Sequence, residues 1–278
     1  MRQKRRQAGI YVVLAVLLLI YVFPFYLVVI NSFKVKRDVV KEPLSLIGKG
    51  GFVPQNYVKA MERMNFGRVL YNSIVITVIS VILIVLFSSM AAYLFARFKW
   101  KINKVLFAVM IISMVIPFQV LMIPIVSIYG AQLHLLNSRW TLIFMHTGFG
   151  VSMGTFLLHG AIISSIPVDL EEAATIDGAG NFKIYRAIVL PLLKPSIVTL
   201  VIIDALAIWN DYLLPSLILV RKDLYTIPIA AQSFHGDFSS DYGLMMAGMV
   251  LMIIPIMIMY VVLQKYIIEG VVAGAVKG

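Results

Sequence analysis

Six apolar blocks, separated by polar or charged connections, organise this sequence of 278 residues. The blocks lie at about 8–30, 70–96, 105–129, 140–163, 196–220 and 243–264. Each reaches the roughly 20 residues that an α-helix needs to cross the apolar core of a bilayer. The pattern therefore predicts an all-α, polytopic membrane protein with six transmembrane helices, forming a single domain over residues 1–278.

The distribution of cations along the connections predicts the orientation of these helices. Four cations lie within the first six residues, and the short connection 97–104 carries four more. Because basic connections are retained on the cytoplasmic side, both of these segments are expected inside, and six spans then place both termini in the cytoplasm. The first apolar run is too long for a signal-peptide core and lacks a cleavage site, so we interpret it as a retained helix.

Composition agrees with a membrane protein and narrows the chemistry. The chain is 61% hydrophobic and 13% charged, with a net charge of +11, which we assign to loops facing anionic lipid rather than nucleic acid. There is no cysteine, so thiol chemistry is excluded. His146 and His159 have no acidic or histidine neighbours at ligand spacing, so no metal site is expected. No catalytic residue is predicted either.

The connection 164–195 is expected to be an ordered segment. Pro167 suits a first helical turn and is followed by good helix formers, and Gly178 is placed for a left-handed helix end. Asn181 is positioned to cap a second short helix that Pro191 would close. Two short helices with a glycine elbow indicate a surface that docks a partner.

This same segment carries a family resemblance. Glu172, Ala173 and Ala174, then Gly178 after three intervening residues, then "IVLP" at 188–191, resemble the cytoplasmic signature of bacterial ABC import permeases. The stretches "IPFQVLMIP", "WNDYLLPSLIL" and "QKYIIEGVVAGAVKG" resemble carbohydrate-uptake permeases, in particular the smaller permease of maltose-type transporters. The resemblance covers essentially the whole chain and implies the ABC importer permease fold.

The resemblance implies that 164–195 is a coupling loop seated on a separate ATPase. The residues expected to make this contact are Glu171, Glu172, Ala173, Ala174, Asp177, Gly178, Ile188, Leu190 and Pro191. The chain lacks the nucleotide-binding pattern G-x-x-x-x-G-K-[ST], so ATP and Mg belong to the partner and this protein is not expected to be an enzyme.

The C-terminal tail is a second expected contact with the ATPase. Its small, nearly uncharged residues suit a narrow slot better than a free tail. The residues concerned are Gly274, Ala275, Val276, Lys277 and Gly278.

The resemblance further implies a bacterial cytoplasmic (inner) membrane location. The implied partners are a second homologous permease, two ATP-binding subunits and an extracytoplasmic sugar-binding protein, which the connection between spans five and six would face. The implied substrate is a carbohydrate, in particular an oligosaccharide. Alternatives are the same machinery carrying another polar solute such as glycerol-phosphate, or a stand-alone secondary transporter or channel. The latter needs internal repeats or a coupling-ion site, and neither is found.

Polar residues within the apolar blocks are candidates for the substrate pathway. These are Gln119, Asn210, Asp211 and Tyr212. Asp211 equally fits a bond between helices, and that interpretation is favoured for Asp204. Gly148, Gly150 and Gly154 are interpreted as close-packing positions, with the partner permease as one candidate neighbour. For Asn72 and Ser73 an interfacial cap is one of two interpretations.

Overall fold

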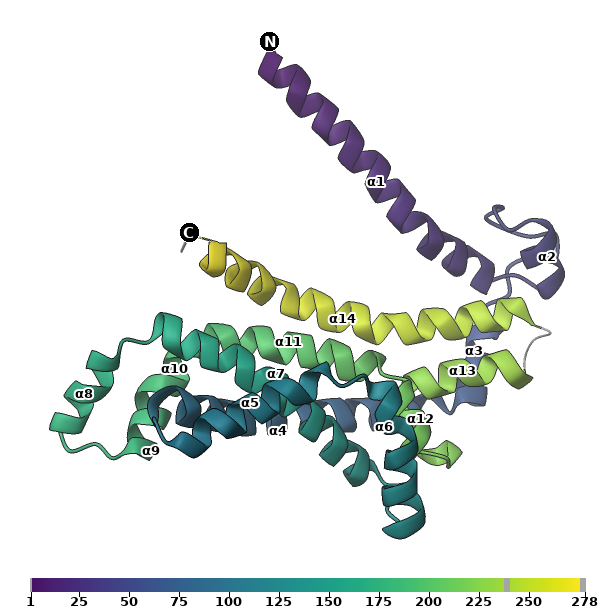
Figure 1. The fold of residues 1–278 in the computed structure, drawn as a ribbon. Helices are drawn as coiled ribbons and strands as arrows, with labels where there is room; N and C mark the ends of the chain where they lie inside the picture. The colour runs from purple at the N-terminus through teal and green to yellow at the C-terminus, as the bar shows by residue number, and fades with distance from the viewer. Residues whose placement is uncertain (1, 238–240, 276–278) are drawn as a thin grey trace. The chain divides into compact units, whose positions relative to one another are not determined.

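The structure is a computed structural model that describes residues 2–237 and 241–275. Every extended element of this part of the chain is a helix, and no strand occurs in it, which confirms the all-α prediction (Figure 1). In chain order the helices are α1 Arg2–Ser32, α2 Lys36–Lys41, α3 Gln55–Met64, α4 Phe66–Arg97, α5 Lys101–Val115, α6 Phe118–Ile125, η1 Val126–Gln132, α7 Arg139–Ser165, α8 Val168–Ile176, α9 Asn181–Ile184, η2 Tyr185–Val189, α10 Leu190–Leu192, α11 Lys194–Asn210, α12 Leu213–Ile218, η3 Lys222–Leu224, α13 Ile227–Asp237 and α14 Tyr242–Ala275.

Four of these helices are long and apolar enough to cross a membrane as single rods. They are Gly9–Ser32 within α1, Phe66–Arg97, Arg139–Ser165 and Tyr242–Val262 within α14. Two bent pairs of helices would raise the number to six: Lys101–Val115 with Phe118–Gln132, and Asn181–Leu192 with Lys194–Asn210. The chain is thus a multi-span membrane protein, and the six spans with both termini inside stay a prediction.

The third expected span, 105–129, is not one straight helix. Its two halves meet at an angle of 95° where Ile116 and Pro117 separate α5 from α6. Ile116 is extended, with φ −70° and ψ 119°, because a residue that precedes proline is kept out of the helical region. Pro117 therefore breaks this span completely instead of bending a single helix.

The prediction of one continuous helix over 196–220, the fifth span, was wrong. α11 ends at Asn210, Asp211 is extended with φ −69° and ψ 125°, and α12 restarts at Leu213. The carboxylate of Asp211 accepts a hydrogen bond from the Leu213 amide at 3.0 Å, so it starts the second helix in place of an unbroken ladder.

The chain divides into two compact units. One comprises Met1–Gly67 with Ala230–Pro255, and the other comprises Arg68–Ile229 with Ile256–Gly278. In the first unit the Asn56 side chain donates to the carbonyl oxygens of Ser32 (2.9 Å) and Lys34 (3.0 Å). A side chain at Gly243 would collide with the Lys34 carbonyl, so the start of α14 packs closely on this junction.

The second unit is built around α4, α7 and α11. A Cβ atom at Gly150 would collide with Ile84, and one at Gly154 would collide with Ser88 and crowd Leu200. Small residues thus let α7 approach α4 closely, as expected, but the neighbour is this chain's own helix. Gly148 has open space instead. α8 and α9 form one projecting end of this unit (Figure 1).

Candidate functional site

The segment 164–195 forms a glycine elbow between two short helical pieces, as predicted. Gly178 has φ +79°, in the left-handed region. Its amide donates to the Thr175 carbonyl at 3.0 Å, and the Ala179 amide donates to the Ala174 carbonyl at 2.9 Å. This pair of bonds is a Schellman motif, which satisfies the last carbonyls of α8 and turns the chain sharply.

The second half of the segment differs from its prediction. Gly180 occupies the N-cap position and its carbonyl accepts from the Ile184 amide at 3.0 Å, whereas Asn181 is the first helical residue and caps nothing. The helix passes through the π-helical turn η2 and ends at Leu192, one residue beyond Pro191. The wider turn accommodates the proline ring, which would otherwise clash with the carbonyl four residues earlier.

The inner face of the segment is fixed by a buried ion pair. Arg97, the last residue of α4, donates from Nε to Glu171 Oε1 at 2.7 Å and from Nη2 to the Ile166 carbonyl at 2.8 Å. Glu171 is buried, and the Tyr185 hydroxyl lies 2.8 Å from Ser89 Oγ on α4. Glu171 was expected to face a partner, but it holds α8 on its own unit.

The outer face is formed by the neighbouring residues. Glu172, Ala173 and Asp177 are exposed. Two large apolar side chains flank the elbow: Ile176 is 86% exposed and Phe182 is 67% exposed. Exposed apolar groups beside an ordered turn are typical of a docking surface. Ile176 and Phe182 were not singled out from the sequence alone. Both could have been recognised, because these two apolar residues interrupt the polar run around Gly178.

Three of the remaining residues predicted for this contact, Ala174, Ile188 and Leu190, are half-buried and pack inward. Ile188 and Leu190 pack against the buried cluster that includes Leu158, Ile162 and Val189. Ala174 is half-buried against the same cluster, while Pro191 is exposed. Three of the predicted contacts therefore help to hold the segment in place.

The structure brings three of the four predicted pathway residues together at the break after α11. Asn210 donates to the carbonyl of Leu206 at 2.8 Å, within its own helix, and Tyr212 is exposed. Asp211 uses one oxygen to accept from the Leu213 amide at the start of α12, and its other oxygen lies 4.0 Å from Nδ1 of His146 on α7. Asp211 thus has a structural role and remains half-buried at a polar gap in an apolar span.

Gln119 lies elsewhere, two residues after Pro117 at the break in the third span, and it is exposed. A groove of about 680 Å³ adjoins this break, between α5, α6 and α7. Most of its lining is apolar, and Gln119 is not part of it. The groove offers few hydrogen-bonding groups, so it does not supply the contacts that a sugar needs.

Several buried polar atoms lie near the α11–α12 break. Nε2 of His146, Oδ2 of Asp204 and Nε1 of Trp209 have no hydrogen-bond partner among the described residues. Asp204 therefore shows no bond to another helix through that oxygen, although such a bond was the favoured interpretation. Buried polar side-chain atoms normally have a hydrogen-bond partner.

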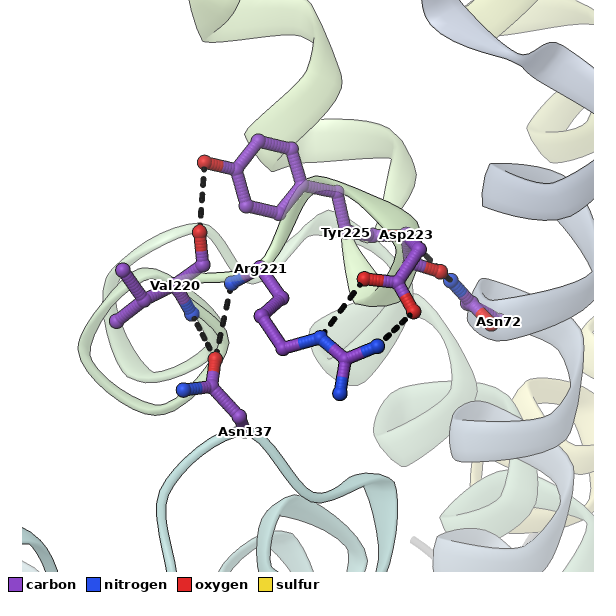
Figure 2. A network of polar contacts seen from close by, with 6 residues as sticks. All are labelled: Asn72, Asn137, Val220, Arg221, Asp223 and Tyr225. Carbon is purple, nitrogen blue, oxygen red and sulfur yellow. Dashed lines mark hydrogen bonds and ion pairs between the residues drawn. The ribbon is translucent and has the colours of Figure 1, made fainter.

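A polar network closes the other end of the second unit (Figure 2). Asn137, with φ +58°, accepts through Oδ1 from the amides of Val220 (2.8 Å) and Arg221 (2.9 Å). Asn72, near the start of α4, donates to the carbonyls of Asp223 and Tyr225, both at 3.0 Å.

Ser73 completes this closure. Its hydroxyl oxygen accepts from the Ile227 amide at 2.9 Å. Asn72 and Ser73 thus cap backbone groups of the chain that follows α12, which supports their interpretation as caps.

The apolar spans define a multi-span membrane protein that has an ordered elbow in one connection and a polar gap in its fifth span. Residues 84–272 match the family described as "Binding-protein-dependent transport system inner membrane component". The chain belongs to this family of transport permeases, which implies the bacterial inner membrane.

Three relatives are similar in sequence to this chain along nearly its full length. The chain is 40% identical over 262 residues to a probable starch degradation products permease of Thermoanaerobacterium thermosulfurigenes, covering 94% of each. It is 36% identical to a melibiose/raffinose/stachyose import permease of Bacillus subtilis, covering 92% of this chain and 91% of the relative. It is 37% identical to a multiple sugar-binding transport permease of Streptococcus mutans, covering 96% of each.

Solved structures have the same fold. A bacterial ABC transporter for the import of the acidic polysaccharide alginate superposes with a TM-score of 0.78 at 21% identity. The match covers 96% of this chain and 98% of that one. The predicted ABC importer permease fold is therefore confirmed.

Proposed function

We propose that this protein is the permease subunit of an ATP-driven importer for an oligosaccharide. Support comes from relatives at 36–40% identity that are named for starch degradation products, melibiose, raffinose and stachyose, or multiple sugars. No described feature favours the alternative of glycerol-phosphate or of a stand-alone transporter.

The proposed assembly has a second homologous permease, two ATP-binding subunits and an extracytoplasmic sugar-binding protein. The family description supports dependence on a binding protein. The absence of a G-x-x-x-x-G-K-[ST] pattern from the sequence supports ATP and Mg binding on separate subunits. In this arrangement six spans cross the bacterial cytoplasmic membrane, with both termini and the segment 164–195 inside.

The observation that carries the coupling role is the contrast between the two faces of α8. Glu171 is held from within by Arg97, so the helix is a rigid part of the permease. Ile176 and Phe182 face outward around the elbow. They would enter an apolar cleft of the ATPase, and Glu172 would meet a basic group there. Closure of the ATPase would then move the helices that continue from the segment.

The substrate would pass the polar break formed by Asn210, Asp211 and Tyr212, with Gln119 as a further candidate. A helix break at membrane depth is tolerated where the backbone lines a cavity, which supports this route.

The tail contact with the ATPase stays a prediction. α14 extends to Ala275, so Gly274 and Ala275 are helical, and Val276, Lys277 and Gly278 lie outside the described residues.

Uptake of labelled maltotriose, raffinose and glycerol 3-phosphate, in cells that lack and regain this gene, tests the substrate class. We expect one of the sugars, and not glycerol 3-phosphate, to depend on the gene. The reverse result would replace the carbohydrate proposal with the alternative.

The coupling role is tested with Ile176→Ser and Phe182→Ser. Both should leave the permease in the membrane and reduce the ATPase that co-purifies with it. Leu192→Ser is the control, because Leu192 is also apolar and exposed but lies at the far end of the segment. Normal ATPase retention in both variants would contradict a docking role for the elbow.

A further inference from the structure

The connection that follows α1 is tied to the last turn of that helix. Asn31 donates from Nδ2 to the carbonyl of Pro43 at 3.0 Å. Lys34 is 1% exposed, and its Nζ donates to Asn31 Oδ1 at 3.0 Å and to the Glu42 carbonyl at 2.9 Å. A buried ammonium requires such partners. These bonds bring residues 42–44 back beside the end of the span.

A second clamp orders the tip of the same connection. The buried carboxylate of Asp38 accepts from the Gly50 amide at 2.6 Å. A Cβ atom at Gly48 would collide with the Asp38 side chain, so the turn closes tightly around it. The rings of Phe33 and Phe52 stack at 4.5 Å. Residues 42–52 therefore form a fixed loop rather than a flexible link.

This fixed loop and the end of α2 present five large apolar side chains to the outside. Each is at least 60% exposed: Val40 in α2, and Leu44, Leu46, Ile47 and Phe52 in the loop. Exposed cations accompany them at Lys36, Arg37, Lys41 and Lys49. Lys49 pairs with Glu42 at 3.0 Å, and Arg37 lies 3.8 Å from the buried carboxylate of Asp38, the other acidic side chain of the connection. The exposed surface of residues 36–52 is thus both apolar and basic.

We propose that residues 40–52 form an interfacial anchor that inserts Leu44, Leu46 and Ile47 into the bilayer surface where α1 leaves it. The span Gly9–Ser32 ends one residue after Asn31, and Asn31 binds Pro43, so the loop lies at the depth of the bilayer boundary. Apolar side chains flanked by Lys and Arg suit that layer, where acyl chains and phosphates lie together.

The occupant of this surface is therefore lipid rather than a soluble protein. A protein that covered Leu46 would have to displace headgroups at the end of the span. The anchor would fix the rotation and depth of α1 through Asn31 and Lys34. This inference depends on α1 crossing the membrane, and not on which solute is carried.

The chain has no cysteine, so a single nitroxide label can be placed without removing any native residue. Leu46→Cys and Ile47→Cys would be labelled in the purified transporter complex, reconstituted in nanodiscs of phosphatidylcholine with phosphatidylglycerol. Collision with oxygen reports an apolar layer, and collision with a water-soluble nickel chelate reports water. Glu62→Cys, on the exposed face of α3, is the aqueous control.

We expect the labels at 46 and 47 to collide more with oxygen than with nickel, and the label at 62 to show the opposite. Adding phosphatidylglycerol to pure phosphatidylcholine should deepen the first two labels and leave the third unchanged. Nickel access at 46 and 47 would overturn the anchor. Protection from both reagents would also overturn it, because it would show a protein cover. Each labelled variant must retain uptake. Two neighbouring sites are labelled so that the test still works if one of the two variants loses uptake.

Discussion

Two arginine–carboxylate pairs of nearly equal length lie near the two ends of α4. Arg97 and Glu171 meet at 2.7 Å, and their side chains are 13% and 9% exposed. Arg221 and Asp223 meet at 2.8 Å, but their side chains are 64% and 33% exposed. Asn72 contacts the backbone of Asp223 (Figure 2), so 25 residues of helix, or roughly 38 Å, separate the two regions.

The comparison indicates that the burial of the two side chains, and not the distance between them, determines how strongly an arginine–carboxylate pair holds the structure together. In water an ion pair gains little because solvent screens it and side-chain entropy opposes it. Where solvent is excluded, removing one partner leaves the other charge without compensation. The first pair therefore holds the segment 164–195 in position, while the backbone bonds of Asn72 and Asn137 hold the second region.

The largest expected effect is that of Arg97→Met. Leaving Glu171 buried without a cationic partner should cost about 3–5 kcal/mol, because a buried carboxylate whose charge is not compensated is poorly solvated. We expect a lower apparent melting temperature in detergent and little permease in the membrane. Replacing both residues by methionine should recover much of the loss, since an apolar pair leaves no buried charge. Equal damage in the single and double variants would show that the ion pair is not the cause.

The next effect is that of Gly178→Ala. Nothing lies within 4 Å of a Cβ atom at this position, so the cost comes from the left-handed backbone alone and should be about 1–2 kcal/mol. Gly180→Ala is the matched control, because Gly180 also has open space but has φ −74°. Uptake and ATPase retention should fall only in the first variant. Similar losses in both would argue that the two glycines serve docking contacts rather than the turn.

Local signals made much of this elbow predictable. The helix formers and Gly178 lie close together in the sequence, between positions 170 and 178, so local sequence is enough to predict the turn. The different roles of Glu171 and Glu172 could not be predicted, because they depend on Arg97, 74 residues away. The break at Asp211 was not predicted either, because the block 196–220 is long and apolar enough overall to form a continuous span. There one side-chain cap outcompetes the helical ladder.

A smaller effect is expected at Asp211, where two variants separate its roles. Asp211→Ala removes the cap of α12 and should cost about 1 kcal/mol, whereas Asp211→Asn keeps an acceptor for the Leu213 amide. If both variants assemble but lose uptake, the charge serves the substrate pathway. Normal uptake with Asn and reduced membrane levels with Ala would leave only the structural role. Sugar uptake normalised to membrane-inserted protein is the measurement.

The smallest effect is expected for Arg221→Ala. The backbone amides of Val220 and Arg221 would keep their bonds to Asn137, so the apparent melting temperature should not change measurably. The hydrogen bonds from Arg221 lower the pKa of the exposed Asp223 carboxyl. The resulting stabilisation is small because solvent screens the pair; it is present above the ordinary pKa of aspartate and is lost as pH falls through the lowered value. Wild type and variant should therefore show the same pH dependence between about pH 5 and 8, where Asp223 is ionised in both. Asn137→Ala removes both backbone bonds and should lower the melting temperature visibly. If Arg221→Ala destabilises the protein as much as Asn137→Ala, exposure does not weaken this pair, and the contrast with Arg97 and Glu171 fails.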